Sequence, residues 1–292
     1  MAITYQSGNT ASNTGTSLTI TKPSGLAEGD LMIAFLGGGQ ENKDWTASGW
    51  TLQDAYSEVG ANSSVGCLYK VANSSDVAAS NFTFTWSGTS TALTGHLARI
   101  TGTETTYYIY SSDSGATTGN SSATYSFSVS IPETENDIML ILFNGTRFNS
   151  VADGSTKFGN YAVVTDDPTW TERADSTVSN YGIGVATAPR SALTDPGNWS
   201  LNINTSGNNG SHSGIGLILV ESVDKNQSID AAGIITLTDP GTHTYIATST
   251  IDMDAAGIIT TSGPEVSVTT KNGTSFTNQS KNSSSWANQS KS

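Results

Sequence analysis

The sequence predicts an all-β protein: a jelly-roll-like β-sandwich built from two duplicated strand sets, followed by a small C-terminal β/repeat attachment segment. Only 13% of the residues are charged, and 30 are glycine. Helix-forming charged residues are therefore scarce, whereas β-branched, aromatic and turn-forming residues are abundant. Short segments alternate apolar and polar residues, as half-buried strands do. Similar segments also recur in the same order in two parts of the chain, which indicates an internal duplication.

Each copy is expected to begin with an alternating strand, a proline-marked turn and a buried strand. In the first copy these are Leu18–Pro23 and Gly29–Phe35, and in the second they are Phe127–Pro132 and Asn136–Leu142. The remaining strands are expected in matched pairs: Ser48–Gln53 and Pro168–Arg173, Val65–Val71 and Tyr181–Ala186, Phe82–Trp86 and Trp199–Ile203, His96–Ile100 and Ile215–Val220.

Five or more strands per copy give a sheet with two edges and one apolar face. We therefore expect the halves, residues 1–105 and 106–222, to pack on each other as one closed sandwich. Two separate small sandwiches are the alternative. The only cysteine, Cys67, cannot form an internal disulfide, so stability must come from packing.

Two further repeats follow residue 222. Asp230–Thr236 recurs as Asp254–Thr260 with a period of 24 residues, so residues 223–265 are expected to form strands of a small sheet or of an intermolecular stem. Residues 266–292 repeat with a period of ten. With one aromatic residue per ten, this tail cannot build its own core, so it is either flexible or ordered by docking on a partner. The residues expected to make that attachment are Phe276, Asn278, Gln279, Trp286, Asn288 and Gln289.

The charge balance argues against a nucleic-acid partner. With 12 basic and 25 acidic residues the net charge is −13, so phosphate neutralisation is unavailable as a binding mechanism. No window of 18 apolar residues predicts a membrane span, and the N-terminus has neither a basic n-region nor an apolar h-region. We expect a soluble protein made in a cytoplasm.

The sequence predicts no metal site, cofactor or catalytic residue. His96, His212 and His243 lack metal-ligand spacing, and we expect His96 and His212 to have structural roles in turns before the last strand of each copy. Asp252 and Asp254 form only a weak calcium pattern. The sequence favours Asp30 and Asp137 as turn residues that accept backbone N–H groups.

Acidic residues near tryptophans leave a glycoside hydrolase or a sugar-binding surface as alternatives. The pairs are Glu41 and Asp44 beside Trp45, and Asp166 and Asp167 before Trp170. Acids in turns are commonly caps, so the sequence favours a structural interpretation.

The tryptophans are expected to divide between core and surface. Trp50 and Trp170 match closely between the copies, whereas Trp86 and Trp199 lie at opposite ends of corresponding strands and match only loosely. The sequence favours core positions for all four. Trp45 has no counterpart and is the candidate for a loop surface that contacts glycan.

Four segments together resemble a known family. Pro23–Phe35, Ser48–Leu52, Leu68–Ala72 and Phe82–Trp86 are similar to a duplicated β-sandwich module found in virion structural proteins of tailed bacteriophages and in prophages. The terminal decapeptides resemble short aromatic-and-Asn repeats at the ends of phage-encoded particle proteins. The resemblance covers about 220 residues.

The resemblance implies a non-enzymatic capsid-decoration, head-fibre or tail-associated protein, located in the virion and assembled in the host cytoplasm. Its partners would be other virion proteins and further copies of itself, with no nucleic acid or membrane partner. We expect the C-terminal segment to attach the sandwich to the particle, the reverse arrangement being the alternative. A carbohydrate-binding module or host-surface adhesin, with a host-surface glycan as partner, is the competing function.

Overall fold

The computed structural model describes most of the first 220 residues and three short strands beyond them. The described ranges are 3–40, 44–58, 63–89, 91–102, 108–119, 122–127, 138–148, 157–165, 167–190, 197–203, 210–220, 235–238, 259–262 and 285–286. The chain divides into two units, Met1–Ser222 and Val223–Ser292, and each is described by itself.

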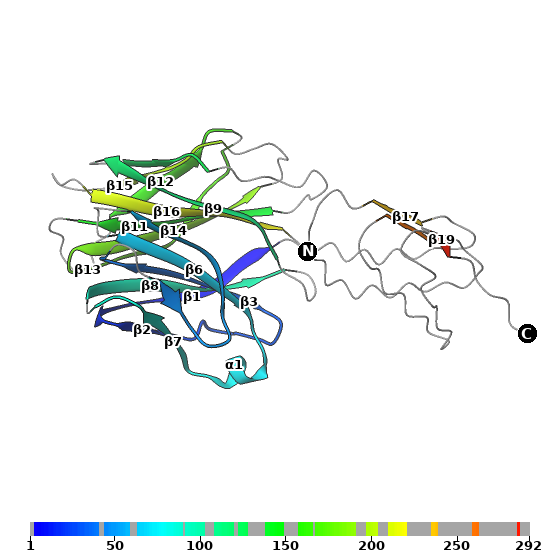
Figure 1. The fold of residues 1–292 in the computed structure, drawn as a ribbon, viewed down its shortest axis with the longest axis horizontal. Helices are drawn as coiled ribbons and strands as arrows, with labels where there is room; N and C mark the ends of the chain where they lie inside the picture. Colours follow the sequence, from blue (N-terminus) through cyan, green and yellow to red (C-terminus); the bar gives the residue numbers. More distant parts are fainter. Residues whose placement is uncertain are drawn as a thin grey trace, which may run out of the picture. The chain divides into compact units, whose positions relative to one another are not determined.

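The first half of unit 1 contains a large and a small antiparallel sheet (Figure 1). The large sheet has the order β1 (Thr4–Gly15), β8 (Thr91–Thr101), β3 (Leu31–Gly38), β6 (Ser63–Val71), β5 (Thr51–Glu58). The small sheet has the order β2 (Ser17–Thr21), β7 (Asn81–Trp86), β4 (Trp45–Thr46). A single helical turn, α1 (Ser74–Ala78), begins with a capping box between Asn73 and Asp76.

The second half repeats this topology. Its large sheet has the order β9 (Tyr108–Gly119), β16 (Gly210–Val220), β11 (Ile138–Arg147), β14 (Tyr181–Arg190), β13 (Thr171–Val178). Its small sheet has the order β10 (Ser122–Tyr125), β15 (Trp199–Ile203), β12 (Phe158–Val163). The labels of equivalent strands therefore differ by eight, so that β1 corresponds to β9 and β8 to β16. The strand order is that of a jelly roll in which the fifth strand has moved to the large sheet.

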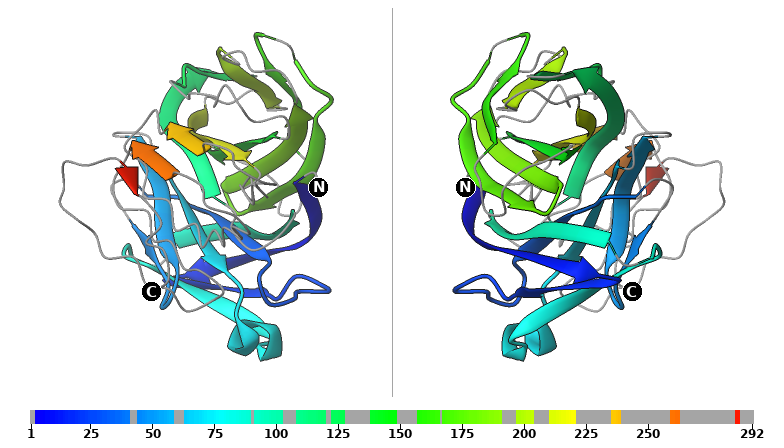
Figure 2. Two further views of the ribbon diagram at one scale, coloured as in Figure 1. Left: turned by 90° about the vertical axis from the view of Figure 1, so that its right-hand side faces the viewer. Right: turned by 90° about the vertical axis from the view of Figure 1, so that its left-hand side faces the viewer.

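Three apolar cores hold the four sheets together as four layers. One core lies between the two sheets of the first half and contains Met32 and Phe84, and another lies between the sheets of the second half and contains Leu140 and Trp199. The third lies between the two large sheets, where Phe35 packs on Phe143 with ring centroids 5.4 Å apart. Figure 2 shows the two halves of unit 1 from both sides, in blue to cyan and in green to yellow.

The two large sheets face each other with approximate two-fold symmetry. β1 contacts β13 at one side of the interface, and β9 contacts β5 at the other. Because β9 is the equivalent of β1 and β5 is the equivalent of β13, the two contacts are related by exchange of the halves. The same exchange relates two further pairs of contacts. The contact of β3 with β14 corresponds to that of β11 with β6, and the contact of β8 with β14 corresponds to that of β16 with β6. The interface is therefore isologous, as in a symmetric dimer, although both halves belong to one chain.

Polar contacts reinforce both margins of this interface. The Arg173 guanidinium lies 4.2 Å from the centre of the Tyr5 ring at the margin of β1 and β13. At the opposite margin, the Ser114 hydroxyl donates to Asp54 Oδ1 over 3.1 Å. The halves are thus joined by apolar packing in the middle and by polar contacts at the sides.

The predicted all-β sandwich is confirmed. The expectation that the two halves close a single sandwich is wrong, because each half has a large and a small sheet of its own, which is nearer to the alternative of two small sandwiches. Alternate residues of β3 enter different cores: Leu31, Ile33 and Phe35 face the second half, whereas Met32 and Leu36 face the small sheet. A sheet that is apolar on both faces must be covered on both faces. Each half is therefore a sandwich in its own right, and the two sandwiches pack together. The duplication itself stays a prediction.

The matched segments of the sequence are not all equivalent residue by residue. Leu31 faces the interface between the halves, but Ile138, its expected counterpart, faces the small sheet of its own half. A slip of one residue reverses the face of every side chain in a strand. In contrast, Trp50 and Trp170 each precede a strand with a β-bulge two residues later, between Leu52 and Asp54 and between Glu172 and Ala174.

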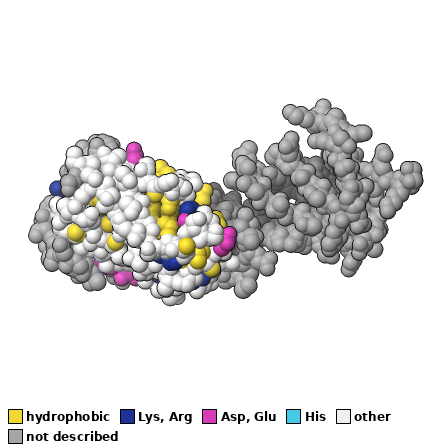
Figure 3. Space-filling model, turned by 90° about the horizontal axis from the view of Figure 1, so that it is seen from below, with side chains coloured by type: hydrophobic (Ala, Val, Ile, Leu, Met, Phe, Trp, Pro, Cys, Tyr) yellow, Lys and Arg dark blue, Asp and Glu magenta, His cyan; other side chains and the backbone are white. Residues whose placement is uncertain are grey.

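The outer face of the first small sheet consists of hydroxyl and amide side chains. Thr19 and Thr83 lie opposite each other in β2 and β7, and their hydroxyl oxygens are 2.8 Å apart. Ser17, Thr21, Asn81 and Thr85 complete this outward row. Figure 3 shows that this side of the described surface is mostly uncharged and polar. The abundance of Thr and Ser thus reflects strands that cover a core with one face only.

In unit 2 the strands follow the 24-residue repeat. β17 (Ile235–Thr238) pairs in parallel with β18 (Ile259–Ser262), and Ile235 lies opposite Ile259. The described residues of the two copies, which begin at Ile235 and Ile259, therefore lie side by side in register. β19 (Ser285–Trp286), from the second decapeptide, pairs antiparallel with the other edge of β18.

We predict that substitution of Gly145 by Ala destabilises unit 1, because the new methyl group has no room between the halves. A Cβ at this position would lie 2.2 Å from Tyr181 Oη and 2.4 Å from Val65 Cγ1. Overpacking of this kind costs about 1–3 kcal/mol. Urea unfolding measures the loss, and Gly159→Ala, whose Cβ would meet nothing within 4 Å, is the control. Equal midpoints for the two variants would contradict the predicted fit.

Candidate functional site

Trp45 lies in the core, so its predicted role as a glycan contact on a loop surface is wrong. Only 1% of the residue is exposed, and its ring packs on Trp86 at 5.0 Å between centroids. The two-residue strand β4 pairs Trp45 with Trp86 of β7 and turns both inward. So short a strand leaves no alternating pattern that sequence analysis could detect.

The other four tryptophans of unit 1 are buried wholly or in part. Trp86 and Trp199 are fully buried, which confirms their predicted core positions. Trp50 and Trp170 are partly buried at the margin of their cores. Trp50 packs on Phe82 and Phe84, and Trp170 packs on Tyr161 and Trp199. Each therefore closes one end of a sandwich.

The acidic residues singled out in the sequence do not form a catalytic pair in the described residues. Asp167 Oδ1 accepts hydrogen bonds from the Trp170 indole N–H and from the Val163 backbone N–H, both over 2.9 Å. Asp167 thus holds a turn, as the structural interpretation predicts. Asp44 is exposed beside β4. Glu41 and Asp166 lie outside the described residues.

The two described histidines lie inside strands, so their predicted place in turns is wrong. His96 of β8 is buried between the halves and hydrogen-bonds through its ring nitrogens to Tyr5 Oη at 3.0 Å and Thr10 Oγ1 at 2.9 Å. Burial, together with the charge of Arg173, lowers the pKa of His96 from 6.5 to about 4. His212 of β16 is also buried and hydrogen-bonds to Thr146 Oγ1 over 2.9 Å. His243 lies outside the described residues.

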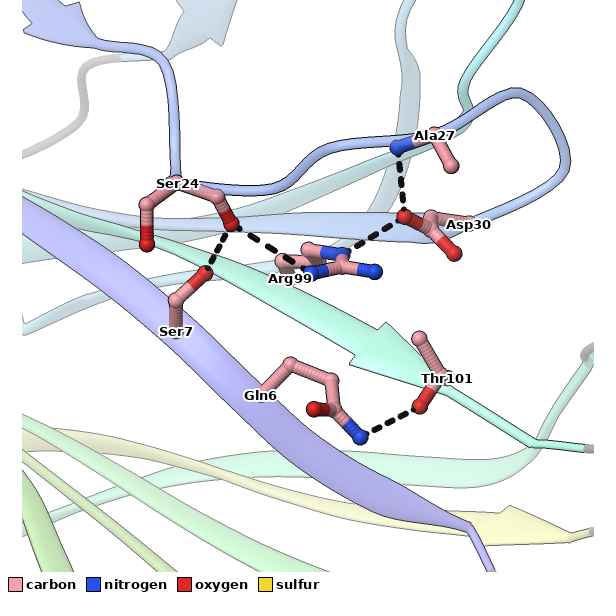
Figure 4. Close-up of polar contacts among 7 residues, drawn as sticks. All are labelled: Gln6, Ser7, Ser24, Ala27, Asp30, Arg99 and Thr101. Atoms are coloured by element: carbon pink, nitrogen blue, oxygen red, sulfur yellow. Dashed lines mark hydrogen bonds and ion pairs between the residues drawn. The ribbon is translucent and has the colours of Figure 1, made fainter.

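Asp30 has the predicted role in a turn (Figure 4). Its Oδ2 accepts the Ala27 N–H over 2.7 Å and an N–H from Arg99 Nε over 2.6 Å. Arg99 also donates to the Ser24 carbonyl over 3.3 Å, which ties the turn to β8. The corresponding Asp137 lies outside the described residues.

The predicted attachment residues fall almost entirely outside the described part of the chain. Phe276, Asn278, Gln279, Asn288 and Gln289 lie outside it, as do Asp252 and Asp254. Of this group only Trp286 is placed, through the backbone pairing of β19 with β18. The attachment role of these residues stays a prediction.

A titratable cluster that the sequence analysis missed lies at one margin of the second half. It consists of Tyr161, Trp170, Glu172 and Asp175, and we call it the Tyr161 corner. Glu172 pairs with Ala186 and Asp175 with Gly184, two residues apart on β14. Both carboxylates therefore lie on the same face of the sheet, the face that Ala186 turns toward the small sheet.

Tyr161 reaches this face from the small sheet. Its hydroxyl lies over Gly184, where a Cβ would be only 2.6 Å from it, so it comes down beside Asp175. Tyr161 is 7% exposed, yet its hydroxyl finds no hydrogen-bond partner in the described part of the chain. Buried hydroxyl groups are usually paired, so this one stands out.

The Asp175 carboxylate is also incompletely satisfied. Asp175 Oδ2 accepts the backbone N–H groups of Lys157 and Phe158 over 2.6 and 2.8 Å, which anchors the start of β12. Asp175 Oδ1 is buried without a partner among the described residues. Burial raises the pKa of Asp175, and burial together with the charge of Asp175 raises that of Glu172.

The first half carries apolar residues at the equivalent places. Counting from the shared Trp-Thr pair and the bulge, Leu52 corresponds to Glu172 and Ala55 to Asp175. Trp45 covers Gly66, the register partner of Ala55, as Tyr161 covers Gly184. The same strand arrangement therefore forms in the first half with Leu, Ala and Trp at this margin.

Comparisons with known proteins give no relationship for this chain. No protein-family model matches it, and no curated protein or solved structure is significantly similar to it. Among the described residues, no three His, Cys, Asp or Glu side chains form a metal-binding group. The described helix is far too short to span a membrane.

We predict that His96 makes stability depend on pH between 6.5 and about 4. The folded state keeps this imidazole neutral, whereas the unfolded chain protonates it near 6.5, so the free energy of unfolding falls as the pH is lowered through this window. The loss attributable to His96 is about 3 kcal/mol, at about 1.4 kcal/mol for each pH unit between the two pKa values.

Denaturant unfolding of the native chain and of His96→Gln at pH 7, 5.5 and 4.5 measures this contribution. The variant should lose less stability on acidification, because glutamine does not titrate. Parallel stability curves for the two proteins would rule out a buried, neutral His96.

Proposed function

We propose that the chain is a non-enzymatic structural component of a bacteriophage particle. In this proposal unit 1 is the exposed body of a decoration, fibre or tail-associated protein, and residues 223–292 attach it to other virion proteins. The observation that carries the proposal is the division of the chain into a body with three apolar cores and a separate repeat segment.

The architecture of unit 1 suits a part that must withstand exposure. Its two halves bury a shared core that includes Phe35, Phe143 and Tyr181, so neither half can open without exposing that core. At both sides of the interface, terminal strands of the two large sheets contact each other, β1 with β13 and β5 with β9. Contacts between the halves therefore extend across the full width of the interface.

The pairing in unit 2 suits attachment. β17 and β18 pair in parallel, and each residue of β17 lies opposite the residue 24 positions later in β18. Strands from the two copies of the repeat therefore pair with each other through their backbones. Strand addition of this kind supplies main-chain hydrogen bonds to a partner, and aromatic residues such as Trp286 commonly supply the anchoring energy of interfaces. The resemblance to duplicated phage modules gives the partner class.

We predict that a chain ending at Ser222 folds but does not join particles. Its three cores are complete, so its thermal unfolding should match that of unit 1 in the full chain. Particles are assembled with the full-length chain or with the chain that ends at Ser222 and are then purified. Mass spectrometry measures how much of each chain the particles contain. Incorporation of the truncated chain at the full-length ratio would refute the attachment role.

A second function is favoured by one observation. The Tyr161 corner brings a partly exposed tryptophan together with two carboxylates, a combination that suits sugars. A carbohydrate-binding module or host-surface adhesin is therefore the alternative, with Trp170 in the place that sequence analysis gave to Trp45.

A further inference from the structure

We propose that the Tyr161 corner binds hydroxyl groups of a saccharide, with Tyr161, Glu172 and Asp175 as hydrogen-bonding residues and Trp170 as the apolar contact. This site is independent of the attachment segment. It rests on unit 1 alone and would serve either a particle protein or a cell-surface binder.

The Tyr161 corner contains two buried polar atoms that lack hydrogen-bond partners among the described residues. The Tyr161 hydroxyl is a buried donor without an acceptor, and Asp175 Oδ1 is a buried acceptor without a donor. An alcohol both accepts and donates, so one hydroxyl or a vicinal pair can satisfy both groups. Leaving such groups unpaired costs free energy in the unbound protein, which a ligand of this chemistry recovers.

The two halves differ in polarity at this margin. Each half has a β-bulge at this margin, and the strand next to it contributes a glycine, Gly66 or Gly184. At the equivalent positions the first half has Leu52 and Ala55, whereas the second has Glu172 and Asp175. Desolvation raises the pKa of both acids, so each carries a burial cost, although Asp175 Oδ2 also anchors the start of β12. Polar groups that are buried in one half and replaced by apolar residues in the other are typical of a binding site.

The groups of the Tyr161 corner suit a saccharide better than a metal ion. Calcium requires six to eight oxygen ligands. Asp175 Oδ2 is already engaged by two backbone N–H groups, and the Tyr161 hydroxyl carries a proton because burial raises its pKa. The corner thus combines a donor with acceptors rather than presenting acceptors alone.

The position of Trp170 completes the site. It lies two residues before Glu172, and its indole N–H is fixed by Asp167 Oδ1 at 2.9 Å. The ring is partly buried against Tyr161 and Trp199. The ring is therefore held rigidly next to the carboxylates. Aromatic rings combine an apolar face with a polar edge, which suits the mixed surface of a sugar.

The test uses the full chain and a panel of probes: glucose, galactose, N-acetylglucosamine and their β-linked trimers. Saturation-transfer NMR and tryptophan fluorescence follow binding. We expect saturable binding of at least one trimer, weakened about tenfold or more in Tyr161→Phe and in Glu172→Gln, because each substitution removes a group that hydrogen-bonds to the sugar. Leu52→Ala, at the equivalent place in the first half, is the matched control and should bind as the native chain does.

Thermal unfolding separates binding from structure. Because the Tyr161 hydroxyl has no partner in the unbound protein, Tyr161→Phe should have a melting temperature no lower than that of the native chain. The proposal is overturned if no probe binds saturably, if both variants bind as tightly as the native chain, or if Tyr161→Phe melts markedly lower. Saturable binding of Ca²⁺ that is lost in Glu172→Gln would also overturn it in favour of a cation site.

Discussion

The structure of unit 1 depends on one constraint: its two large sheets are apolar on both faces. All eight residues of β3 and nearly all of β11 are buried, with alternate side chains in different cores. Such strands are stable only between two other layers. The small sheets cover one face of each large sheet, and the large sheets cover each other. The four layers, the three cores and the approximate two-fold relation follow from this requirement.

The close approach of the large sheets accounts for the small residues at their interface. Gly37 and Gly145, one from each half, leave room for the ring of Tyr181, whose hydroxyl donates to the Ser64 carbonyl over 3.1 Å. Ser63 and Ser213 hydrogen-bond across the same interface over 3.2 Å. Buried polar groups are thus paired across the two halves, which fixes their relative position more specifically than apolar contact alone.

Local patterns in the sequence predicted the all-β class, the matched Trp-Thr segments and the turn held by Asp30, because each depends on neighbouring residues. β1 and β9 escaped prediction because these polar strands lie at sheet edges and show little apolar alternation. Trp45 was misplaced because its burial depends on pairing with Trp86, 41 positions away in the chain.

The Tyr161 corner could not be read from the sequence for a related reason. Glu172 and Asp175 are three residues apart, which in a regular strand would put them on opposite faces. The bulge between Glu172 and Ala174 returns both to one face, and Tyr161 reaches them from a different sheet. The one signal in the sequence is the contrast with Leu52 and Ala55, and it becomes meaningful only once the register is known.

The central claim, that this chain is a repeating structural part of a virus particle, is tested most directly by the protein composition of phage-like particles purified from the source culture. Quantitative mass spectrometry gives its abundance relative to the major capsid protein. The account predicts a high and fixed ratio across independent preparations. Absence of the chain from intact particles would contradict it and leave the saccharide-binding function as the primary one.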